Sequence, residues 1–278
     1  MISLPRPTRV SALMSTHRGE CAANLEASLM SLKNQIKKPD QIVLVIDGPV
    51  DVEQVSLIRR FKEGNESLDL TIISMPQNGG LAAAMNQGLA ACTGDYIMRM
   101  DSDDLSLPDR LLIEKSYLDD HPKIDLVATW SSEFNQDDTD LCLKTSPTEH
   151  DAIVQALRWR NVIAHPSILI RKDALIRVGG YRTTVNLLED YDLYVRLILN
   201  GARFHVIPKV LLRVRTNQNQ RARRGNFRYF IHECRFRYDC FKVGFLNWHQ
   251  FISTTILYGL FRLIGTPIRG RLYAMVRT

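Results

Sequence analysis

Residues 94–104 read Gly-Asp-Tyr-Ile-Met-Arg-Met-Asp-Ser-Asp-Asp, a stretch in which an apolar strand runs directly into acidic residues. Three more apolar runs precede it, at 10–14, 41–46 and 70–74, and helical patterns separate them. The run at 41–46, Gln-Ile-Val-Leu-Val-Ile, is of the β-branched kind that is buried on both faces of a parallel sheet. This alternation predicts an α/β fold, in which helices cover both faces of an open, mostly parallel sheet.

Apolar residues at helical spacing, such as Leu25, Leu29 and Leu32, locate the expected helices. Further helices are expected over 51–62, 81–91, 108–120 and 191–200, and a fifth strand over 124–129. The chain has 278 residues, of which 45% are hydrophobic and 24% charged, so it has ample material for a core and is not disordered.

Polar residues follow each of the first four predicted strands. Thr16 follows the first strand, Asp47 the second, Asn78 the third, and Asp101 to Asp104 the fourth. Ligands of open α/β sheets bind at the carboxyl ends of the strands. The four strand ends therefore predict one binding site, although the general polarity of loops is an alternative explanation.

Asp101 and Asp103 stand at alternate positions after the fourth strand. Paired carboxylates suit a hard divalent cation such as Mg²⁺ or Mn²⁺, which takes oxygen ligands. The same Asp-Ser-Asp-Asp pattern also occurs in ordinary turns and in calcium loops. A calcium hand would need a Glu at its twelfth position, where this chain has Leu112. The spacing alone leaves a metal site and a plain turn open.

Longer motifs carry a family resemblance. In the first half they are Asn78-Gly-Gly-Leu-Ala-Ala-Ala-Met-Asn86-Gln-Gly88, Gly94-Asp-Tyr-Ile-Met-Arg-Met-Asp101-Ser-Asp103-Asp104 and Pro108-x-Arg110-Leu111. In the second half they are His165-Pro166-Ser167, Val178-Gly-Gly-Tyr181-Arg182 and Glu189-Asp190-Tyr-Asp192-Leu-Tyr194-Val-Arg196-Leu197. In this order and spacing they resemble glycosyltransferase family 2, and within it the bacterial enzymes that build exopolysaccharide and lipopolysaccharide O-antigen.

The resemblance implies a GT-A fold over residues 1–215, with a donor-binding half at about 9–130 and an acceptor-side half at 131–215. Residues 216–278 would then form a basic, amphipathic helical extension. It also implies transfer of a sugar, with inversion, from a nucleotide diphosphate donor such as a UDP-sugar. The expected acceptor is a saccharide hydroxyl, carried on a polyprenyl diphosphate lipid.

The resemblance further assigns roles to single residues. Asp101 and Asp103 would hold Mn²⁺ or Mg²⁺, and Asp190, beside Glu189, would be the general base. The residues expected to bind the donor are Thr16, Glu20, Asp47, Asn78, Asn86, Asp101 and Ser102. Contacts with the acceptor or with phosphate are expected from His165, Arg196 and Arg215.

Some of these positions have a simpler explanation. Glu189 and Asp190 could merely cap the helix that follows them, and a lone histidine such as His165 is often structural. Family members usually carry Val-Tyr-Asn where this chain has Ser15-Thr16-His17, and a second acid where it has Gly48-Pro49. Both departures concern recognition of the nucleotide base.

Charge divides the chain into two parts. Residues 201–278 hold 15 Lys and Arg but only two acids, whereas residues 1–200 hold 21 basic and 28 acidic residues. The basic part contains apolar residues at spacings of three and four, and arginines near their end. The apolar residues are Phe245, Trp248, Ile252, Ile256, Leu260 and Leu263, and the arginines are Arg262, Arg269, Arg271 and Arg277. The pattern predicts a helix that lies in an anionic membrane interface, or else one that packs on the body of the protein.

Other classes are excluded or disfavoured. Five scattered cysteines without a Cys-x-x-Cys pair indicate neither a disulfide framework nor a zinc site. No signal peptide or long apolar run is present, so we expect a cytoplasmic protein, peripheral on the inner face of the membrane. No nucleic-acid motif occurs, and no nucleic-acid partner is expected. A sugar nucleotidyltransferase would need a glycine-rich loop where residues 15–20 supply one glycine, and a non-catalytic module would not need Asp101, Asp103 and Asp190.

Overall fold

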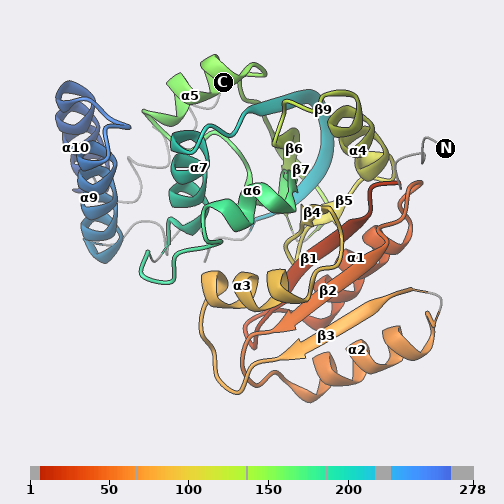
Figure 1. The fold of residues 1–278 in the computed structure, drawn as a ribbon. Helices are drawn as coiled ribbons and strands as arrows, with labels where there is room; N and C mark the ends of the chain where they lie inside the picture. The colour runs from red at the N-terminus through yellow and green to blue at the C-terminus, as the bar shows by residue number, and fades with distance from the viewer. Residues whose placement is uncertain (1–6, 67, 136, 186, 217–226, 264–278) are drawn as a thin grey trace.

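The computed structural model describes residues 7–263 except 67, 136, 186 and 217–226 (Figure 1). In these residues nine strands form one mixed sheet, ordered β3-β2-β1-β4-β8-β6-β9-β5, with β7 paired to β6. The strands are β1 (Val10–Thr16), β2 (Gln41–Ile46), β3 (Leu70–Ser74), β4 (Tyr96–Arg99), β5 (Leu105–Ser106), β6 (Leu126–Phe134), β7 (Asp140–Lys144), β8 (Leu169–Arg171) and β9 (Phe204–Arg215). The helices are α1 (Ala22–Lys33), α2 (Val52–Glu63), α3 (Leu81–Ala91), α4 (Arg110–Asp120), α5 (His150–Leu157), α6 (Lys172–Arg177), α7 (Glu189–Leu199), α9 (Phe227–Lys242) and α10 (Trp248–Leu263), and η1 (His165–Ser167) is a 3-10 turn.

The first half of the chain builds a parallel sheet. Strand β1 pairs in parallel with both β2 and β4, and β2 pairs in parallel with β3. At the carboxyl edge Thr16 stands opposite Ile46, and Ile46 stands opposite Ser74. The residues that follow these strands are thereby gathered along one edge of the sheet, as the sequence predicts.

The second half adds antiparallel pairs. Strand β8 runs antiparallel to β4 and to β6, whereas β9 runs parallel to β6. The end of β9 pairs with β5, where Arg213 stands opposite Leu105. Strand β9 therefore returns the chain to the loop that follows β4, which holds the acidic residues.

Two apolar layers cover the two faces of the sheet. One layer packs α1, α2 and α4 on alternate strand residues, among them Val10, Met14 and Leu44. The other layer packs α3 and α7 on the residues that point the opposite way, such as Leu13 and Val43. Because successive side chains of a strand point to opposite faces, one apolar run supplies both layers.

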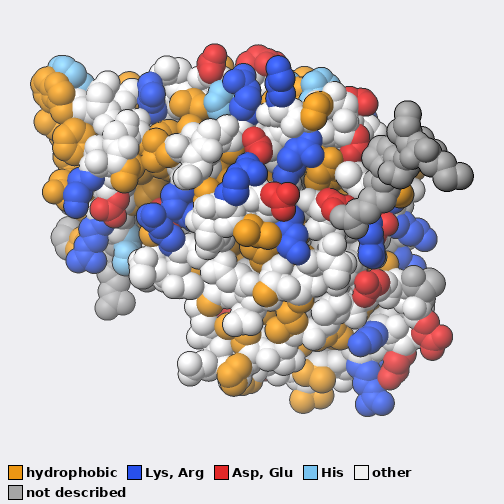
Figure 2. Space-filling view, viewed as in Figure 1, with side chains coloured by type: hydrophobic (Ala, Val, Ile, Leu, Met, Phe, Trp, Pro, Cys, Tyr) orange, Lys and Arg blue, Asp and Glu red, His pale blue; other side chains and the backbone are white. Residues whose placement is uncertain are grey.

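Helices α9 and α10 form an antiparallel pair at one side of the molecule (Figure 1). The ring of Phe236 in α9 packs on Tyr191 of α7, with ring centroids 4.7 Å apart. The outer face of α10 leaves apolar side chains exposed, with Trp248 at 56%, Ile252 at 45% and Ile256 at 56% of their surface. Figure 2 shows hydrophobic side chains gathered over this end of the molecule.

In the described part of the chain, every helix is too short or too polar to span a bilayer.

The predicted elements are largely confirmed. Strands β2 and β3 and helix α3 have the predicted bounds, and α7 begins at Glu189 rather than at Tyr191. The prediction missed α5, α6, β5, β7, β8 and β9. The α/β architecture is confirmed, and helices α9 and α10 lie where the helical extension is predicted.

The extension differs from its prediction in one respect. Phe245 is not part of the exposed face, because it precedes α10 and only 4% of its surface is exposed. No side chain is described beyond Gly259 in α10, which leaves out those of Leu260, Arg262 and Leu263, and Arg269, Arg271 and Arg277 lie outside the described residues altogether. The five cysteines are free thiols.

Candidate active site

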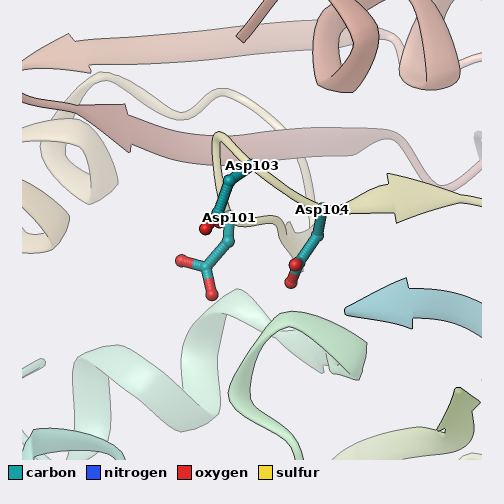
Figure 3. Close-up of side chains that lie close together, drawn as sticks. All are labelled: Asp101, Asp103 and Asp104. Carbon is teal, nitrogen blue, oxygen red and sulfur yellow. The ribbon is translucent and has the colours of Figure 1, made fainter. Parts of the chain in front are cut away.

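The loop between β4 and β5 brings three carboxylates together (Figure 3). One oxygen from each of Asp101, Asp103 and Asp104 lies within 4.8 Å of the others. Burial, together with the charges of Asp101 and Glu20, raises the pKa of Asp103 to about 7. Burial also raises the pKa of Asp104, whose Oδ2 has no hydrogen-bond partner among the described residues. Such crowding of carboxylates suits a cation.

Arg99 in β4 adjoins this acidic loop, and only 3% of it is exposed. Its guanidinium pairs with the carboxylate of Asp101, while its Nε and Nη1 have no hydrogen-bond partner within the described residues. Burial and the charge of Arg99 together lower the pKa of His165 well below its ordinary value. His165 is therefore a neutral side chain at this position.

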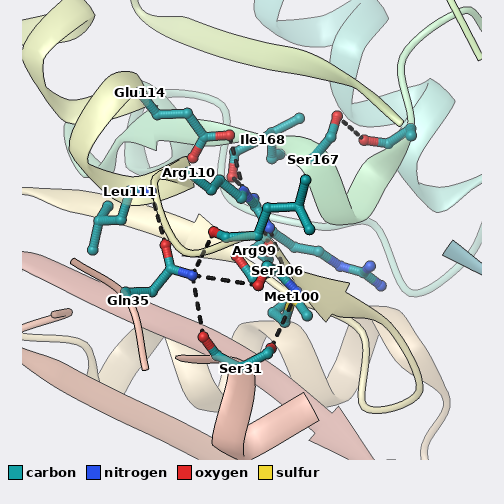
Figure 4. A network of polar contacts seen from close by, with 12 residues as sticks. Ser31, Gln35, Arg99, Met100, Ser106, Arg110, Leu111, Glu114, Ser167 and Ile168 are labelled. Atoms are coloured by element: carbon teal, nitrogen blue, oxygen red, sulfur yellow. Dashed lines mark hydrogen bonds and ion pairs between the residues drawn. The ribbon is translucent and has the colours of Figure 1, made fainter. Parts of the chain in front are cut away.

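A buried network fixes the base of the acidic loop (Figure 4). Nη2 of Arg110 donates to the carbonyl oxygen of Arg99 over 3.1 Å, and its Nε pairs with Glu114 at 3.0 Å. The backbone N–H of Leu111 donates to Oε1 of Gln35 over 3.0 Å. The segment that follows α1 and helix α4 are thus tied to each other, and α4 is tied to the end of β4.

Two more residues, Ser28 and Arg215, hold the acidic loop itself through three hydrogen bonds. The hydroxyl of Ser28 in α1 donates to the carbonyl oxygen of Asp101 over 2.8 Å. At the end of β9, the backbone N–H of Arg215 donates to Oδ1 of Asp104 over 2.8 Å, and its Nε donates to the carbonyl oxygen of Asp103 over 3.0 Å. The predicted phosphate ligand Arg215 therefore lies against the acidic loop.

Asp47 organises the neighbouring strand ends. Its carboxylate accepts hydrogen bonds from the backbone N–H groups of Gly79, at 2.7 Å, and Gly80, at 3.0 Å. Nδ2 of Asn78 donates to the carbonyl oxygen of Asp47 over 3.1 Å. Gly48 has φ +82°, and a Cβ there would lie 2.5 Å from the backbone nitrogen of Asn78. Only glycine allows the two loops to approach so closely.

The other residues predicted for the donor lie around the same edge. Thr16 is fully buried, and its Oγ1 has no hydrogen-bond partner in the described part of the chain. Oε1 of Glu20 accepts from the backbone N–H of Cys21 over 2.8 Å and from Asn24 over 3.0 Å. Ser102 is 6% exposed. The charge of Glu20 raises the pKa of Asp103, so Glu20 and the acidic loop belong to one electrostatic site.

Helix α7 begins with the two acids predicted for catalysis. Oδ2 of Asp190 accepts a hydrogen bond of 2.7 Å from Asn161, and Oδ1 accepts one of 2.8 Å from the backbone N–H of Tyr191. Oε1 of Glu189 accepts from the backbone N–H of Leu187, outside the helix. The N-cap residue is Leu188, whose apolar side chain makes no capping hydrogen bond, so the bond from Tyr191 to Asp190 is one way in which a first-turn N–H of the helix finds an acceptor. Burial and the charge of Asp190 raise the pKa of Glu189.

Tyr181 links this helix to the acidic loop. Burial raises its pKa, and the charges of Asp190 and Asp101 raise it further, so both carboxylates act on the same buried ring. The Tyr181 hydroxyl lies 2.8 Å from Nε2 of His165. The side-chain amide of Asn86 bonds both the backbone N–H and the carbonyl oxygen of Tyr181, at 2.8 and 2.7 Å. Asn86 thus holds Tyr181 in place.

Arg196, the remaining predicted residue, is 8% exposed. Its Nε donates to Asp192 over 2.7 Å, and its Nη1 donates to the carbonyl oxygen of Val178 over 2.8 Å. These contacts fix α7 to the turn that precedes Tyr181.

A comparison with known families now identifies the chain. The model of "Glycosyl transferase family 2" matches residues 11–179. This chain belongs to glycosyltransferase family 2. Among its relatives, the amylovoran biosynthesis glycosyltransferase AmsE of Erwinia amylovora is 32% identical over 271 residues, which cover 96% of this chain and 92% of the relative. The UDP-Gal:alpha-D-GlcNAc-diphosphoundecaprenol beta-1,3-galactosyltransferase of Escherichia coli is 27% identical over 268 residues, 96% of each chain.

Solved structures share the fold of this glycosyltransferase. TarS 1–349 of S. aureus in complex with UDP-GlcNAc matches with a TM-score of 0.68 and 16% identity, over 89% of this chain and 71% of that one. The mannosyltransferase PcManGT from Pyrobaculum calidifontis, in complex with GDP-Man and Mn²⁺, matches with a TM-score of 0.61 and 21% identity, over 83% of this chain and 62% of that one. At these identities the likeness concerns the fold.

The structure adds residues to which the sequence assigned no role. Asp104 belongs to the acidic loop, Arg99 at the end of β4 pairs with Asp101 of that loop, and Asn161 contacts Asp190. A charge within the apolar strand 95–100 is a signal that could have drawn attention to Arg99. No local pattern marks Asn161, because it meets Asp190 only through the fold.

Proposed function

We propose that this family 2 glycosyltransferase transfers a sugar, with inversion, from a UDP-sugar to a hydroxyl of a saccharide acceptor, and that it needs a divalent cation. The observation that carries the proposal is the arrangement around Tyr181. The charge of Asp101 in the acidic loop and the charge of Asp190 at the start of α7 both act on this buried ring, whose hydroxyl lies 2.8 Å from Nε2 of His165. We also propose that residues 1–215 form the catalytic domain and 216–278 its extension.

The acidic loop fits a divalent cation. Burial and mutual repulsion raise the pKa of Asp103 and of Asp104, and a buried oxygen of Asp104 lacks a partner among the described residues. Asp101 and Asp103 would hold Mn²⁺ or Mg²⁺, with Asp104 beside them. When bound, the ion neutralises charge on the leaving diphosphate. Arg215, which already touches this loop, would add its guanidinium to the same phosphates.

The strand ends would hold the nucleoside. We propose that Thr16, Glu20, Asp47 and Asn78 surround the base and ribose, with Asn86 and Ser102 further from it. The buried, unpartnered Oγ1 of Thr16 supports this assignment, because buried polar atoms normally have a partner. The Escherichia coli relative is named for UDP-Gal, which supports uridine as the nucleoside.

Asp190 would be the general base. Its carboxylate would accept the proton of the acceptor hydroxyl as that oxygen bonds to the anomeric carbon, while the bond to the diphosphate oxygen breaks on the opposite face. Attack from the side opposite the leaving group inverts the anomeric centre. Glu189, the preceding residue, would place a second negative charge beside the carboxylate of Asp190. His165 and Arg196 would support the acceptor site indirectly, by holding the residues around it. The ring of His165 bonds Tyr181, and Arg196 bonds Asp192 and Val178.

For the acceptor we propose a sugar on a polyprenyl diphosphate, in polysaccharide biosynthesis at the cytoplasmic face of the membrane. The relative from Escherichia coli is named for a diphosphoundecaprenol substrate. The exposed apolar residues of α10, Trp248, Ile252 and Ile256, would lie in the membrane interface.

Flotation with vesicles that contain anionic lipid tests this docking. The double variant Trp248→Ser/Ile256→Ser should lose vesicle binding, whereas the control Val52→Ser, which changes an 80% exposed apolar residue on α2, should not. Failure of the unaltered protein to bind vesicles at low salt would remove the membrane from the proposal.

An assay of donor turnover tests the function itself. Purified protein with Mn²⁺, a panel of nucleotide sugars and a synthetic diphospholipid-GlcNAc acceptor should release free UDP. Asp190→Asn should abolish transfer and leave UDP binding intact, while Asp101→Ala should weaken metal-dependent donor binding. Turnover of a nucleoside triphosphate with release of pyrophosphate would instead indicate a sugar nucleotidyltransferase. Donor binding without any turnover would indicate a binding module.

A further inference from the structure

Asn161 contacts the carboxylate of Asp190 directly. Nδ2 of Asn161 donates to Oδ2 of Asp190 over 2.7 Å, and the backbone N–H of Tyr191 donates to the other oxygen over 2.8 Å. Each oxygen of the carboxylate therefore has a fixed donor. An ionised carboxylate has further lone pairs on both oxygens, so these two bonds orient it and leave it able to accept a proton.

The segment that carries Asn161 is itself held from both sides. Oδ1 of Asn161 accepts from the backbone N–H of Ile163 over 3.2 Å, which closes a local turn. The carbonyl oxygen of Trp159 accepts from the hydroxyl of Tyr258 in α10 over 3.2 Å and from Nη2 of Arg237 in α9 over 3.5 Å. The C-terminal helix pair thus bonds the backbone two residues before Asn161.

The two helical residues that make these bonds are rigidly placed. The guanidinium of Arg237 lies over the ring of Tyr258, 4.3 Å from its centroid, and pairs with Glu233 at 3.1 Å. Arg237 is 1% exposed and Glu233 is 5% exposed. Buried charged groups that are paired in this way hold one geometry, because breaking the pair leaves a charge without compensation.

We propose that Asn161 is a positioning residue for the general base, and that the α9–α10 pair fixes Asn161 through the carbonyl oxygen of Trp159. This inference rests on the role proposed above for Asp190. A base must lie within hydrogen-bond reach of the proton it removes, and a displacement of about 1 Å costs on the order of 100-fold in rate. The amide N–H also stabilises the ionised carboxylate, the form that accepts a proton.

The variant Asn161→Asp distinguishes two roles of Asn161: positioning the carboxylate of Asp190, and closing the turn with the backbone of Ile163. Aspartate keeps the oxygen that accepts from Ile163 and keeps the shape of the side chain, but it removes the donor to Asp190. We expect kcat for sugar transfer to fall by about 10- to 100-fold. The KM of the donor and the affinity for UDP should stay unchanged. Asn161→Ala should show the same split, and the control Asn65→Ala, which loses a comparable bond to Phe61 far from the site, should keep wild-type kcat.

Asn161→Asp with wild-type kcat would overturn the inference. If Asp190→Asn itself transfers sugar at the wild-type rate, the base role fails, and the result is thereby distinct from failure of the positioning role alone.

Tyr258→Phe tests the contribution of the helix pair, because it removes a single hydroxyl. We expect kcat to fall by about 2- to 10-fold, with unchanged UDP affinity. The matched control is Tyr238→Phe, which removes a hydroxyl from a 50% exposed tyrosine of α9 and should leave kcat unchanged. Wild-type kcat in Tyr258→Phe would overturn the coupling between the helix pair and Asn161.

Discussion

The backbone N–H of Arg215 donates a hydrogen bond of 2.8 Å to Oδ1 of Asp104, 111 residues earlier in the chain. The guanidinium of Arg215 donates to the carbonyl oxygen of Asp103 and lies over the ring of Phe134, 4.5 Å from its centroid. The last residue of β9 therefore holds the acidic loop, as Ser28 of α1 also does. The shape of the proposed metal site depends on a strand that is distant in the sequence.

Arg215→Ala should weaken metal-dependent donor binding. The variant keeps the backbone bond to Asp104 but loses the guanidinium that orders the loop at Asp103. We expect UDP affinity in the presence of Mn²⁺ to fall by about 10-fold, the effect of losing one charge-assisted hydrogen bond, as titration calorimetry can measure. Arg215→Lys should not restore binding, since an ammonium lacks the planar fork and cannot stack as well on Phe134.

Arg213→Ala is the matched control for this prediction. Its guanidinium lies over the same ring of Phe134 at 4.5 Å, but its polar contacts are with Asp138 and Asp140, away from the acidic loop. It should keep UDP affinity near the wild-type value. Equal losses in the two arginine variants would show that stacking on Phe134, rather than contact with the loop, explains the effect.

Binding of the divalent cation should weaken as the pH falls through 7. Burial and the charges of Asp101 and Glu20 raise the pKa of Asp103 to about 7, and a carboxylate must lose its proton to hold a cation. Below pH 7 a bound proton therefore competes with the ion, and above pH 7 it does not. The increase in melting temperature on addition of Mn²⁺ should be small at pH 5.5 and large at pH 8. A shift in melting temperature that does not depend on pH, or one that persists in Asp103→Ala, would contradict this assignment.

Asp47→Asn should disturb two loops at once. The carboxylate accepts hydrogen bonds from the backbone N–H groups of Gly79 and Gly80, and an asparagine offers only one oxygen for both. One N–H would face an amide N–H₂ group instead. We expect a loss of about 0.5–1.5 kcal/mol in the free energy of unfolding, because one of the two part-buried hydrogen bonds to Asp47 is lost. Denaturant unfolding measures this loss.

UDP affinity should fall with it, because Asn78 bonds the backbone of Asp47. The control is Asp51→Asn, an acid with 60% of its side chain exposed, located before α2 and paired only at the surface. If Asp47→Asn unfolds at the wild-type denaturant concentration, the carboxylate is not the organiser of these loops.

Local pattern predicted the first half of the fold well. The apolar run 41–46 and the helix that begins after Gly80 are encoded by neighbouring residues, and β2 and α3 have the predicted bounds.

Strand β9 was not predicted, because Pro208 and Lys209 interrupt its apolar pattern. In the structure both are exposed, and the register between β6 and β9 shifts there: Ile207 stands opposite Thr129, whereas Val210 stands opposite Trp130. The two extra residues form a bulge in β9, so its sequence does not show the alternating pattern of one continuous strand.

The proposed site divides in the same way. Asp101, Asp103 and Asp190 could be named from motifs, since each belongs to a short pattern. The contacts that orient them could not, because Asn161 reaches Asp190 and Arg215 reaches Asp103 only after distant strands and helices have packed. The sequence is thus sufficient to identify the carboxylates, whereas the groups that orient them are brought into contact only by the tertiary structure.

The buried pair of Arg110 and Glu114 predicts a dependence of stability on pH. Both side chains are fully buried, and burial raises the pKa of Glu114 to about 7 although Arg110 opposes the shift. Because the folded pKa exceeds the unfolded value, this group contributes stability at low pH and loses that contribution as the pH rises through 7. Glu114→Gln resembles the protonated side chain at every pH. It should match the wild type near pH 5 and become the more stable protein, relative to wild type, as the pH rises to 8.5.

Glu114→Ala should instead cost about 3–5 kcal/mol, because it leaves a buried guanidinium without its partner. The control is Glu63→Ala, which breaks a pair of the same spacing, with Arg59, on the exposed face of α2. It should leave the unfolding midpoint unchanged, since solvent screens an exposed pair. Denaturant unfolding of the wild type and the three variants at pH 5, 7 and 8.5 measures all four cases. A wild type that gains stability relative to Glu114→Gln as the pH rises would show that Arg110 outweighs burial and holds Glu114 ionised. The network beneath the acidic loop would then be an ion pair throughout the range in which a sugar transferase works.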